Sequence, residues 1–430
     1  MSRVVVVGGG IAGLSVAGLL AVRGHRVTLT EKMFELGGRS LMQERDGFRL
    51  NYGAHAVYAR DRSAMQKVLD ALNVRVDFAT PHLDMVRYIT ETGRETGPSV
   101  SLAGLLHTKL LPGFRDKAHF VHAVLSILAF TGTPGDSVSF QEWLDRRGWT
   151  LATRNLLLHL VATNFFTEQP GDLRASTVLG YYRRVLRTHH PVSYIVGGWG
   201  VLVQSLRERL EEAGVQILEK TAITALQFEQ SALKSVQSRN EVFEADIFVL
   251  CAPPTALKKL VADTPLSPFV VPYAAEEPNT ALVYDVALTK RVRNDVSYVS
   301  DMKRHVFITD PSLYDSSCVP DGGQLLQAIA YTSAKAADDE AVLMERRKAV
   351  ESLYDAYYPG WREALAFSRV TDQAVVQGIG WGREQKRLPM HFHDFPNVYF
   401  AGDWCDAAGS VSDVAFDSAW TVASAVGMAF

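Results

Sequence analysis

Three glycines near the N-terminus have the spacing of a dinucleotide-binding turn. Gly8, Gly10 and Gly13 form the pattern G-x-G-x-x-G directly after residues 4–7, four valines that read as a strand buried on both faces. The first glycine permits a tight turn, the second lets the backbone approach a pyrophosphate, and the third lets a helix pack closely on the strand. The N-terminus of that helix would offer free N–H groups and a partial positive charge to phosphates. The pattern therefore predicts a dinucleotide site.

The residues after the glycines supply the rest of this unit. The small, apolar residues 11–22 predict a helix packed on a sheet, and the β-branched residues 26–29 predict a second strand that leads to Glu31. A carboxylate at this position can accept a hydrogen bond from a ribose 2′-OH and would repel a 2′-phosphate. We therefore expect a dinucleotide other than NADP.

Further glycines lie in two other motifs. Residues 37–39 read Gly-Gly-Arg, and an arginine behind two glycines can reach back to a pyrophosphate with its forked donors. A hairpin turn is predicted at residues 46–47, and it leads to Gly53, where the backbone could come close to a flat ring. Near the other end of the chain, residues 397–404 read NVYFAGDW, a predicted strand that runs into Gly-Asp.

Together these motifs resemble the FAD-dependent oxidoreductases that include phytoene desaturases, protoporphyrinogen oxidases and flavin amine oxidases. The resemblance covers both ends and the middle of the chain, and it is loose in the segments between. In that family the Gly-Asp motif brings an aspartate to the ribityl and pyrophosphate groups, a role implied here for Asp403. The cofactor-binding residues that the resemblance implies are Gly8, Gly10, Ile11, Ala12, Gly13, Glu31, Lys32, Gly38, Arg39, Gly53, Ala54, Ala222, Gly402, Asp403 and Val414.

The family also bears on how FAD is attached. Its members that bind FAD covalently use a cysteine upstream of the last motif, and residues 378–381 (GIGW) contain none, so the resemblance implies noncovalent FAD. The chain departs from the family at Asn51, where an acidic residue is common, and at Ser418-Ala419, where Ser-Gly is usual. Neither departure removes the expectation of FAD binding.

The implied fold class is α/β, with a Rossmann-like FAD-binding domain interleaved with a mixed α+β substrate domain. The FAD-binding domain would comprise residues 1–60, 191–275 and 388–430, and the substrate-binding domain would comprise residues 61–190 and 276–387. The first insert reads as mostly helical and contains a capping box at residues 139–142, with Val138 and Trp143 placed for a hydrophobic staple. The second insert alternates as a sheet would over residues 279–287, 306–309 and 324–331.

The implied reaction is removal of a hydride from a C–C or C–N bond of a hydrophobic small metabolite, as in a desaturase or dehydrogenase. Oxygen or another electron acceptor would then take the electrons. A flavin amine oxidase that releases peroxide is the main alternative. A non-redox, FAD-dependent isomerase and a flavin-binding sensor are further alternatives, and the substrate itself is left open.

The sequence contains few candidates for acid–base catalysis or for substrate binding. His55 lies where the family's chain passes the flavin and could carry a proton, or could simply be held by the backbone beside the cofactor. Tyr58 and Trp381 could line the substrate pocket, or could belong to the core. A helix beginning around residues 412–414 would point its N-terminus at the anionic N1 of reduced flavin, with Val414 as the N–H donor. His391 and His393 are too few for a metal site, so we expect no metal.

Composition limits the possible partners and compartment. The chain has 430 residues, a net charge of −3 and no basic tract, which argues against nucleic-acid binding and favours two or three domains. Three widely spaced cysteines indicate a reducing compartment, and no apolar stretch reads as a secretory signal or a membrane span, so we expect a cytoplasmic protein. Residues 119–132 read as a core helix or as a helix at the pocket mouth that rests on a membrane surface. The oligomeric state is left open.

Overall fold

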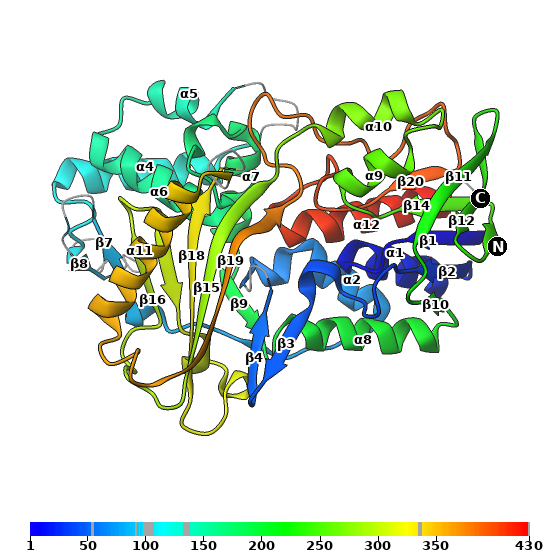
Figure 1. The fold of residues 1–430 in the computed structure, drawn as a ribbon. Helices are drawn as coiled ribbons and strands as arrows, with labels where there is room; N and C mark the ends of the chain where they lie inside the picture. The colour runs from blue at the N-terminus through cyan, green and yellow to red at the C-terminus, as the bar shows by residue number, and fades with distance from the viewer. Residues whose placement is uncertain are drawn as a thin grey trace.

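The computed structural model describes residues 1–52, 56–90, 93, 95–97, 107–131, 138–333 and 338–428. Its elements form two parts that lie side by side, one around a parallel sheet and the other around a larger mixed sheet (Figure 1). The first strand and the last helix both belong to the part with the parallel sheet, so the chain leaves this part and returns to it.

The parallel sheet is built from short, fully apolar strands. Its strands, in spatial order, are β10 (Gln216–Leu218), β2 (Arg26–Thr30), β1 (Arg3–Val7), β14 (Ile247–Leu250) and β20 (Val398–Phe400). All neighbouring pairs are parallel, and β1 lies between β2 and β14. The chain therefore leaves β1 toward one edge and later returns on the other side, which creates a topological switch point at the carboxyl end of β1.

Helices cover one face of this sheet and a smaller sheet covers the other. The first face packs against α1 (Ile11–Val22), α2 (Ala64–Leu72), α8 (Trp199–Glu212) and α12 (Ser412–Met428). The second face packs against β11 (Ile223–Glu229), β12 (Ala232–Ser238), α9 (Pro254–Leu260) and α10 (Ser267–Ala274), and β13 (Val242–Glu244) extends this antiparallel sheet. Because both faces are covered, four consecutive residues of β1 are buried, as the run of valines predicted.

The mixed sheet has seven strands and draws on both inserts. In spatial order they are β19 (Leu365–Gln377), β15 (Asn279–Leu288), β18 (Gln324–Thr332), β17 (Val306–Thr309), β16 (Tyr298–Asp301), β7 (Val86–Ile89) and β8 (Glu95–Thr96). The three strands predicted from alternation, β15, β17 and β18, are confirmed. β7 comes from the first insert and pairs in parallel with β16, so the two inserts share one sheet.

Helices lie on both sides of the mixed sheet. α11 (Glu340–Tyr357) packs on one face, and α6 (Leu151–Phe165) contributes to the core on the other. Around α6 lie α4 (Phe114–Leu128), α5 (Phe140–Asp145) and α7 (Ala175–Val185). The predicted capping box of α5 is confirmed, because Ser139 and Glu142 exchange N–H hydrogen bonds of 3.0 and 3.1 Å.

Two small sheets complete the fold. The predicted hairpin is formed by β3 (Met42–Arg45) and β4 (Phe48–Asn51). A three-stranded sheet contains β5 (Ala56–Tyr58), β9 (Val192–Ile195) and β6 (Phe78–Ala79). The mixed helix and strand fold is the one predicted, a Rossmann-like domain with a substrate domain. The residue boundaries of the two domains remain a proposal. Helix α2 packs into the core of the parallel-sheet part.

Candidate functional site

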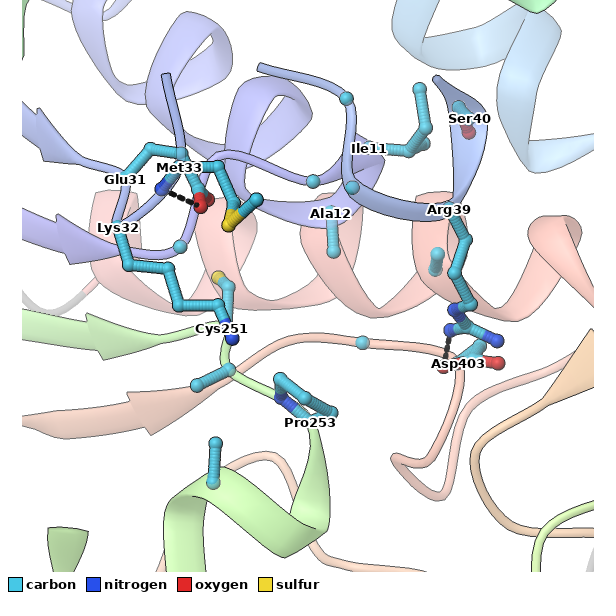
Figure 2. Close-up of a pocket in the computed structure, with 18 of the residues that line it drawn as sticks. Ile11, Ala12, Glu31, Lys32, Met33, Arg39, Ser40, Cys251, Pro253 and Asp403 are labelled. Carbon is cyan, nitrogen blue, oxygen red and sulfur yellow. Dashed lines mark hydrogen bonds and ion pairs between the residues drawn. The ribbon is translucent and has the colours of Figure 1, made fainter. Parts of the chain in front are cut away.

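A cavity of about 400 Å³ opens at the carboxyl ends of β1, β2 and β14, where the switch point lies. We call it the strand-end cavity. Its wall combines the start of α1, the Gly-Gly-Arg loop at residues 37–39, residues 402–404 before α12 and residues 411–412 at its start. Figure 2 shows Glu31 and Lys32 on one side of this cavity and Arg39 with Asp403 on the other.

The glycine turn leaves room at the point where a ligand would approach. Gly8 has a φ of +111°, a left-handed conformation that favours glycine. A Cβ at Gly13 would lie 1.8 Å from the carbonyl oxygen of Gly8, so α1 can start here only with glycine at this position. A Cβ at Gly10 would meet nothing within 4 Å, and Gly10 lines the cavity. The open space at Gly10 faces the first N–H groups of α1, which have no acceptor within the helix.

Glu31 is held rigidly beside this turn. Its carboxylate is buried and accepts the N–H of Gly9 at 2.7 Å and the N–H of Met33 at 2.9 Å. Both carboxylate oxygens thus have a fixed direction at the end of β2, and each keeps acceptor capacity for a hydroxyl group. This placement suits recognition of a ribose.

An ion pair closes the opposite side of the cavity. One Nη of Arg39 lies 2.5 Å from a carboxylate oxygen of Asp403, and its other Nη donates to the carbonyl of Val376 at 3.3 Å. Asp403 is buried, and its second oxygen accepts the N–H of Gly378 at 2.8 Å. Arg39 is half-exposed and can therefore rotate toward an anionic group in the cavity while Asp403 stays fixed.

A buried arginine that the sequence reasoning missed supports the Asp403 loop. Arg387 donates to the backbone carbonyls of Cys405 and Gly380, each at 3.0 Å, and also to those of Ile379 and Asp403. Its guanidinium lies 3.9 Å from the ring centre of Trp381. Burial lowers the pKa of Arg387 to about 10. No local signal marks this residue, because its partners come from two loops that meet only in the folded chain.

The structure brings most of the predicted cofactor-binding residues together. Those that line the strand-end cavity are Gly8, Gly10, Ile11, Ala12, Glu31, Lys32, Gly38, Arg39, Ala222, Gly402 and Asp403. Gly13 lies beneath the turn and Val414 lies in the core, so neither lines the cavity. Gly53, Ala54 and His55 fall outside the described residues.

Other lining residues were not predicted. They are chiefly Trp199, Thr221, Cys251, Val375, Val376 and Val411, whereas Asn51 and Ser412, which also line the cavity, lie in segments expected near the flavin. Trp199 directly follows a double glycine, which is a signal that could have been used. The valines of β19 carry no such signal, because they reach the cavity only through the packing of the mixed sheet. Burial raises the pKa of Cys251 to about 12, so this thiol stays protonated at neutral pH.

A second cavity of about 210 Å³ lies between α6 and the mixed sheet, and we call it the tyrosine cavity. Tyr58, one of the two residues expected in the substrate pocket, lines this cavity, and the other, Trp381, lies in the neighbouring core. Ala56 and Tyr58 also line a small cleft shared with Val411 and Ser412, which line the strand-end cavity. The tyrosine cavity is therefore next to the start of α12 and close to the strand-end cavity.

The described residues contain neither a metal-binding cluster nor a membrane-spanning helix. No group of three or more His, Cys, Asp or Glu side chains is arranged there to hold a metal ion. In the same part of the chain, no helix combines the length and the apolar character that crossing a membrane requires.

The family model for flavin-containing amine oxidoreductases matches residues 11–427. The chain belongs to this family. It is similar to 4,4'-diapolycopen-4-al dehydrogenase of Metabacillus indicus, at 21% identity over 95% of this chain and 94% of that protein. The predicted family and the enzyme class are thereby confirmed: the chain is a flavin-dependent oxidoreductase of the desaturase or amine oxidase type.

Solved structures share the fold. An oxidoreductase from Methanosarcina mazei superimposes with a TM-score of 0.81 at 15% identity, covering 98% of this chain and 99% of that one. A redesigned putrescine oxidase gives a TM-score of 0.75 at 18% identity, covering 100% and 99%. The family implies a flavin, and the strand-end cavity fits a dinucleotide, because a carboxylate, a glycine turn at a helix start and an arginine all line it.

Proposed function

We propose that the chain binds FAD noncovalently in the strand-end cavity and removes a hydride from a C–C or C–N bond of a hydrophobic small metabolite. Glu31 would accept a ribose hydroxyl, the glycine turn would hold the pyrophosphate, and Asp403 would orient the ribityl chain. The observation that carries this proposal is the alignment of these groups along one cavity. The lining thiol supports noncovalent binding, because Cys251 is protonated and lies on the Lys32 side, away from Asp403.

The chemistry comes from the flavin, which when bound accepts a hydride with both electrons of the broken C–H bond. A proton leaves the neighbouring carbon or nitrogen, so that a C=C or C=N bond forms, and oxygen or another acceptor finally takes the two electrons. The chain would orient the flavin and the substrate. The N-terminus of α12, where Ser412 lines the cavity, would stabilise negative charge on the reduced ring. His55 is the proposed proton carrier on grounds of sequence alone.

We place the substrate in the tyrosine cavity, next to the start of α12. Its largely apolar lining supports a hydrophobic substrate, in keeping with the similarity to 4,4'-diapolycopen-4-al dehydrogenase. A flavin amine oxidase remains the alternative, supported by the shared fold with putrescine oxidase.

We also propose that α4 rests on a membrane surface. Its outer face exposes Phe114, Val121 and Leu125 by 85, 40 and 58%. These residues recur at helical spacing along one stripe, and the exposed Arg115 lies at its start. α4 packs on α6, which lines the tyrosine cavity, so a hydrophobic substrate would have a short route from a bilayer.

The cofactor and reaction are tested by the visible spectrum of the purified protein. We expect a flavin band that acid precipitation releases into the supernatant, because the FAD is not covalently attached. Under anaerobic conditions a substrate should bleach this band as the flavin accepts the hydride. A protein that takes up no added FAD would overturn the proposal, and bleaching by amines alone would assign the amine oxidase alternative.

A matched pair of variants isolates the cavity. Glu31→Gln should weaken FAD binding about tenfold, because an amide is a poorer acceptor for a ribose hydroxyl and its NH₂ group faces the backbone N–H groups that Glu31 now binds. Glu35→Gln is the control, since Glu35 is exposed and does not line the cavity. Equal FAD affinity of the two variants would contradict the assignment of Glu31.

A further inference from the structure

The tyrosine cavity is aromatic and uncharged. Among its described lining residues there is no carboxylate, lysine, arginine or histidine, and the aromatic lining includes Tyr58, Tyr88, Phe166, Tyr298 and Phe307. A charged ligand would lose its hydration here and would find no counter-charge in return. The lining therefore selects for an uncharged molecule.

Two phenol groups of this cavity lack a protein partner. Tyr194 and Tyr314, which also line it, are hydrogen-bonded through Thr309. The hydroxyls of Tyr58 and Tyr88, in contrast, form no hydrogen bond to any residue that the structure describes, and both side chains are partly buried. A partly buried hydroxyl that has no protein partner can donate a hydrogen bond to a ligand oxygen.

Tyr58 and Tyr88 belong to one cluster of phenols around this cavity, because the phenol of Tyr298, which also lines it, is close to both. The phenol of Tyr58 is close enough to those of Tyr182, Tyr194 and Tyr331 for each to raise its pKa, and Tyr88 has the same effect on Tyr182. Burial also raises the pKa of Tyr88 to about 12, so both Tyr58 and Tyr88 remain neutral hydrogen-bond donors at physiological pH. Tyr58 and Tyr88 thus line the same cavity as neutral donors.

An acceptor lies beside these donors. The side-chain amide of Asn164 donates to the carbonyl of Leu160 at 3.0 Å and to the hydroxyl of Tyr182 at 2.7 Å. This arrangement leaves the amide oxygen of Asn164, which lines the cavity, as an acceptor. A ligand with a hydroxyl group could therefore both donate and accept, and a carbonyl could accept from the two tyrosines.

We propose that the tyrosine cavity binds an uncharged ring compound that carries a carbonyl or hydroxyl oxygen, and that Tyr58 and Tyr88 donate hydrogen bonds to this oxygen. The inference rests on the proposed function, in which this cavity holds the substrate. A volume of about 210 Å³ is below the roughly 300–1,000 Å³ of sites for drug-sized ligands, so the ligand, or the part of it that enters, is small.

The test uses four compounds with one carbon skeleton: 4-tert-butylcyclohexanone, 4-tert-butylcyclohexanol, 4-tert-butylcyclohexylamine and tert-butylcyclohexane. Their affinities for the purified, flavin-loaded protein are measured by calorimetry at neutral pH, where the amine is a cation. The ketone and the alcohol should bind at least tenfold more tightly than the amine and the hydrocarbon. Tightest binding of the amine or of the hydrocarbon would overturn the inference.

Variants assign the contact to the two hydroxyls. Tyr58→Phe and Tyr88→Phe should each weaken ketone binding about fivefold, the effect of one hydrogen bond, and leave binding of the hydrocarbon unchanged. Tyr181→Phe is the control, because the hydroxyl of Tyr181 is likewise without a partner among the described residues, but Tyr181 does not line this cavity. Unchanged ketone affinity in both cavity variants would refute the assignment, and hydrocarbon binding verifies that each variant is folded.

The inference and the proposed function fail in different ways. The binding measurement needs no turnover, and it is repeated on protein freed of flavin. If the ketone binds with the expected dependence on Tyr58 and Tyr88 while the protein takes up no FAD, the proposed function is wrong and the site stands. If FAD binds and is bleached by a substrate while the ketone series shows no preference, the site assignment is wrong and the proposed function stands.

Discussion

At the scale of single residues, Gly13 shows how one atom determines the geometry of the strand-end cavity. A Cβ there would lie 1.8 Å from the carbonyl oxygen of Gly8, a backbone atom that cannot move without opening the turn. The spacing of the glycines predicted this close approach from the sequence alone. The same spacing does not tell which of the three glycines line the cavity. Gly13 supports the turn from beneath and is not part of the cavity wall.

The Gly13→Ala variant should lose about 1–3 kcal/mol in its free energy of unfolding, because overpacking forces the backbone to shift. FAD binding should weaken with it. Gly180→Ala is the control: Gly180 lies in α7, a Cβ there meets nothing within 4 Å, and a gain of about 0.5–1 kcal/mol is expected. Urea unfolding measures both. Equal stability of the two variants would contradict the close contact at Gly13.

His159 makes stability depend on pH. This buried residue of α6 lies 3.1 Å from the hydroxyl of Ser300 through Nε2, and its Nδ1 has no partner among the described residues. Burial and, to a smaller extent, the nearby His305 lower its pKa to about 4, and Asp301 opposes this shift. The unfolded chain, in which the pKa is about 6.5, binds the proton more readily. The stability that the neutral form of His159 contributes to the folded protein is therefore complete above pH 6.5, and it is lost as the pH falls toward 4.

The His159→Gln variant, which can keep the hydrogen bond to Ser300, should flatten this pH dependence. The free energy of unfolding of the natural protein should fall between pH 7 and pH 4 by more than that of the variant, and the difference is at most about 3 kcal/mol. Urea titrations at several pH values measure both slopes. Parallel curves for the two proteins would show that His159 is not the titrating group.

At the scale of elements, one buried ion pair joins the mixed sheet to the β3–β4 hairpin. Asp285 on β15 is fully buried and accepts from Arg369 on β19 at 2.5 and 2.9 Å. Arg369 also donates to the backbone carbonyl of Asn51 at 2.5 Å and to the side chain of Gln43 at 3.1 Å. This pair fixes the end of the hairpin against the part of the molecule that contains the mixed sheet. Because Asn51 lines the strand-end cavity, the pair also supports one edge of that cavity.

The Arg369→Met variant should lose about 3–5 kcal/mol of stability, because it leaves the Asp285 carboxylate buried without its partner. The double variant Asp285→Leu/Arg369→Met should lose less, since it removes both charges. Arg347→Met tests a more exposed pair, between Arg347 on α11 and Asp372 on β19, and should cost at most about 1 kcal/mol. The three free energies come from urea unfolding. A double variant less stable than Arg369→Met alone would refute the argument.

At the scale of the whole molecule, the sequence predicted structure formed by neighbouring residues better than structure formed by residues far apart in the chain. Residues 11–22 form a helix with the predicted bounds, and the strands before and after it are where the sequence indicated, because spacing and periodicity act within a few turns. β19 was missed, since one of its faces is largely exposed and its burial alternates weakly. The tyrosine cavity was missed as a whole. Its wall comes from residues between Ala56 and Ile329, and no spacing in the chain brings them together.

The position of α4 gives the whole molecule a candidate membrane-facing side. Helix α4 belongs to the part that contains the mixed sheet, and it lies on the side of this part that is turned away from the parallel sheet (Figure 1). Leu186, another exposed apolar residue, lies next to its end, because Arg187 donates to the carbonyl of Leu128 at 3.1 Å. A second segment thus brings an exposed apolar residue near the end of the α4 stripe. Exposed apolar residues accompanied by the exposed Arg115 and Arg187 suit an anionic bilayer better than water.

The Val121→Glu/Leu125→Glu variant tests this orientation. Natural protein should co-sediment with vesicles of phosphatidylcholine and phosphatidylglycerol, and more strongly than with phosphatidylcholine alone, because the arginines favour an anionic surface. The variant should bind at least tenfold more weakly, since two apolar side chains that would enter the bilayer are replaced by charges. Val242→Glu is the control: Val242 is 58% exposed on β13, in the other part of the molecule, and its replacement should leave vesicle binding unchanged. If the α4 variant and the control bind vesicles equally, or if the natural protein does not sediment with them, α4 does not rest on a membrane, and the substrate must reach the tyrosine cavity from solution.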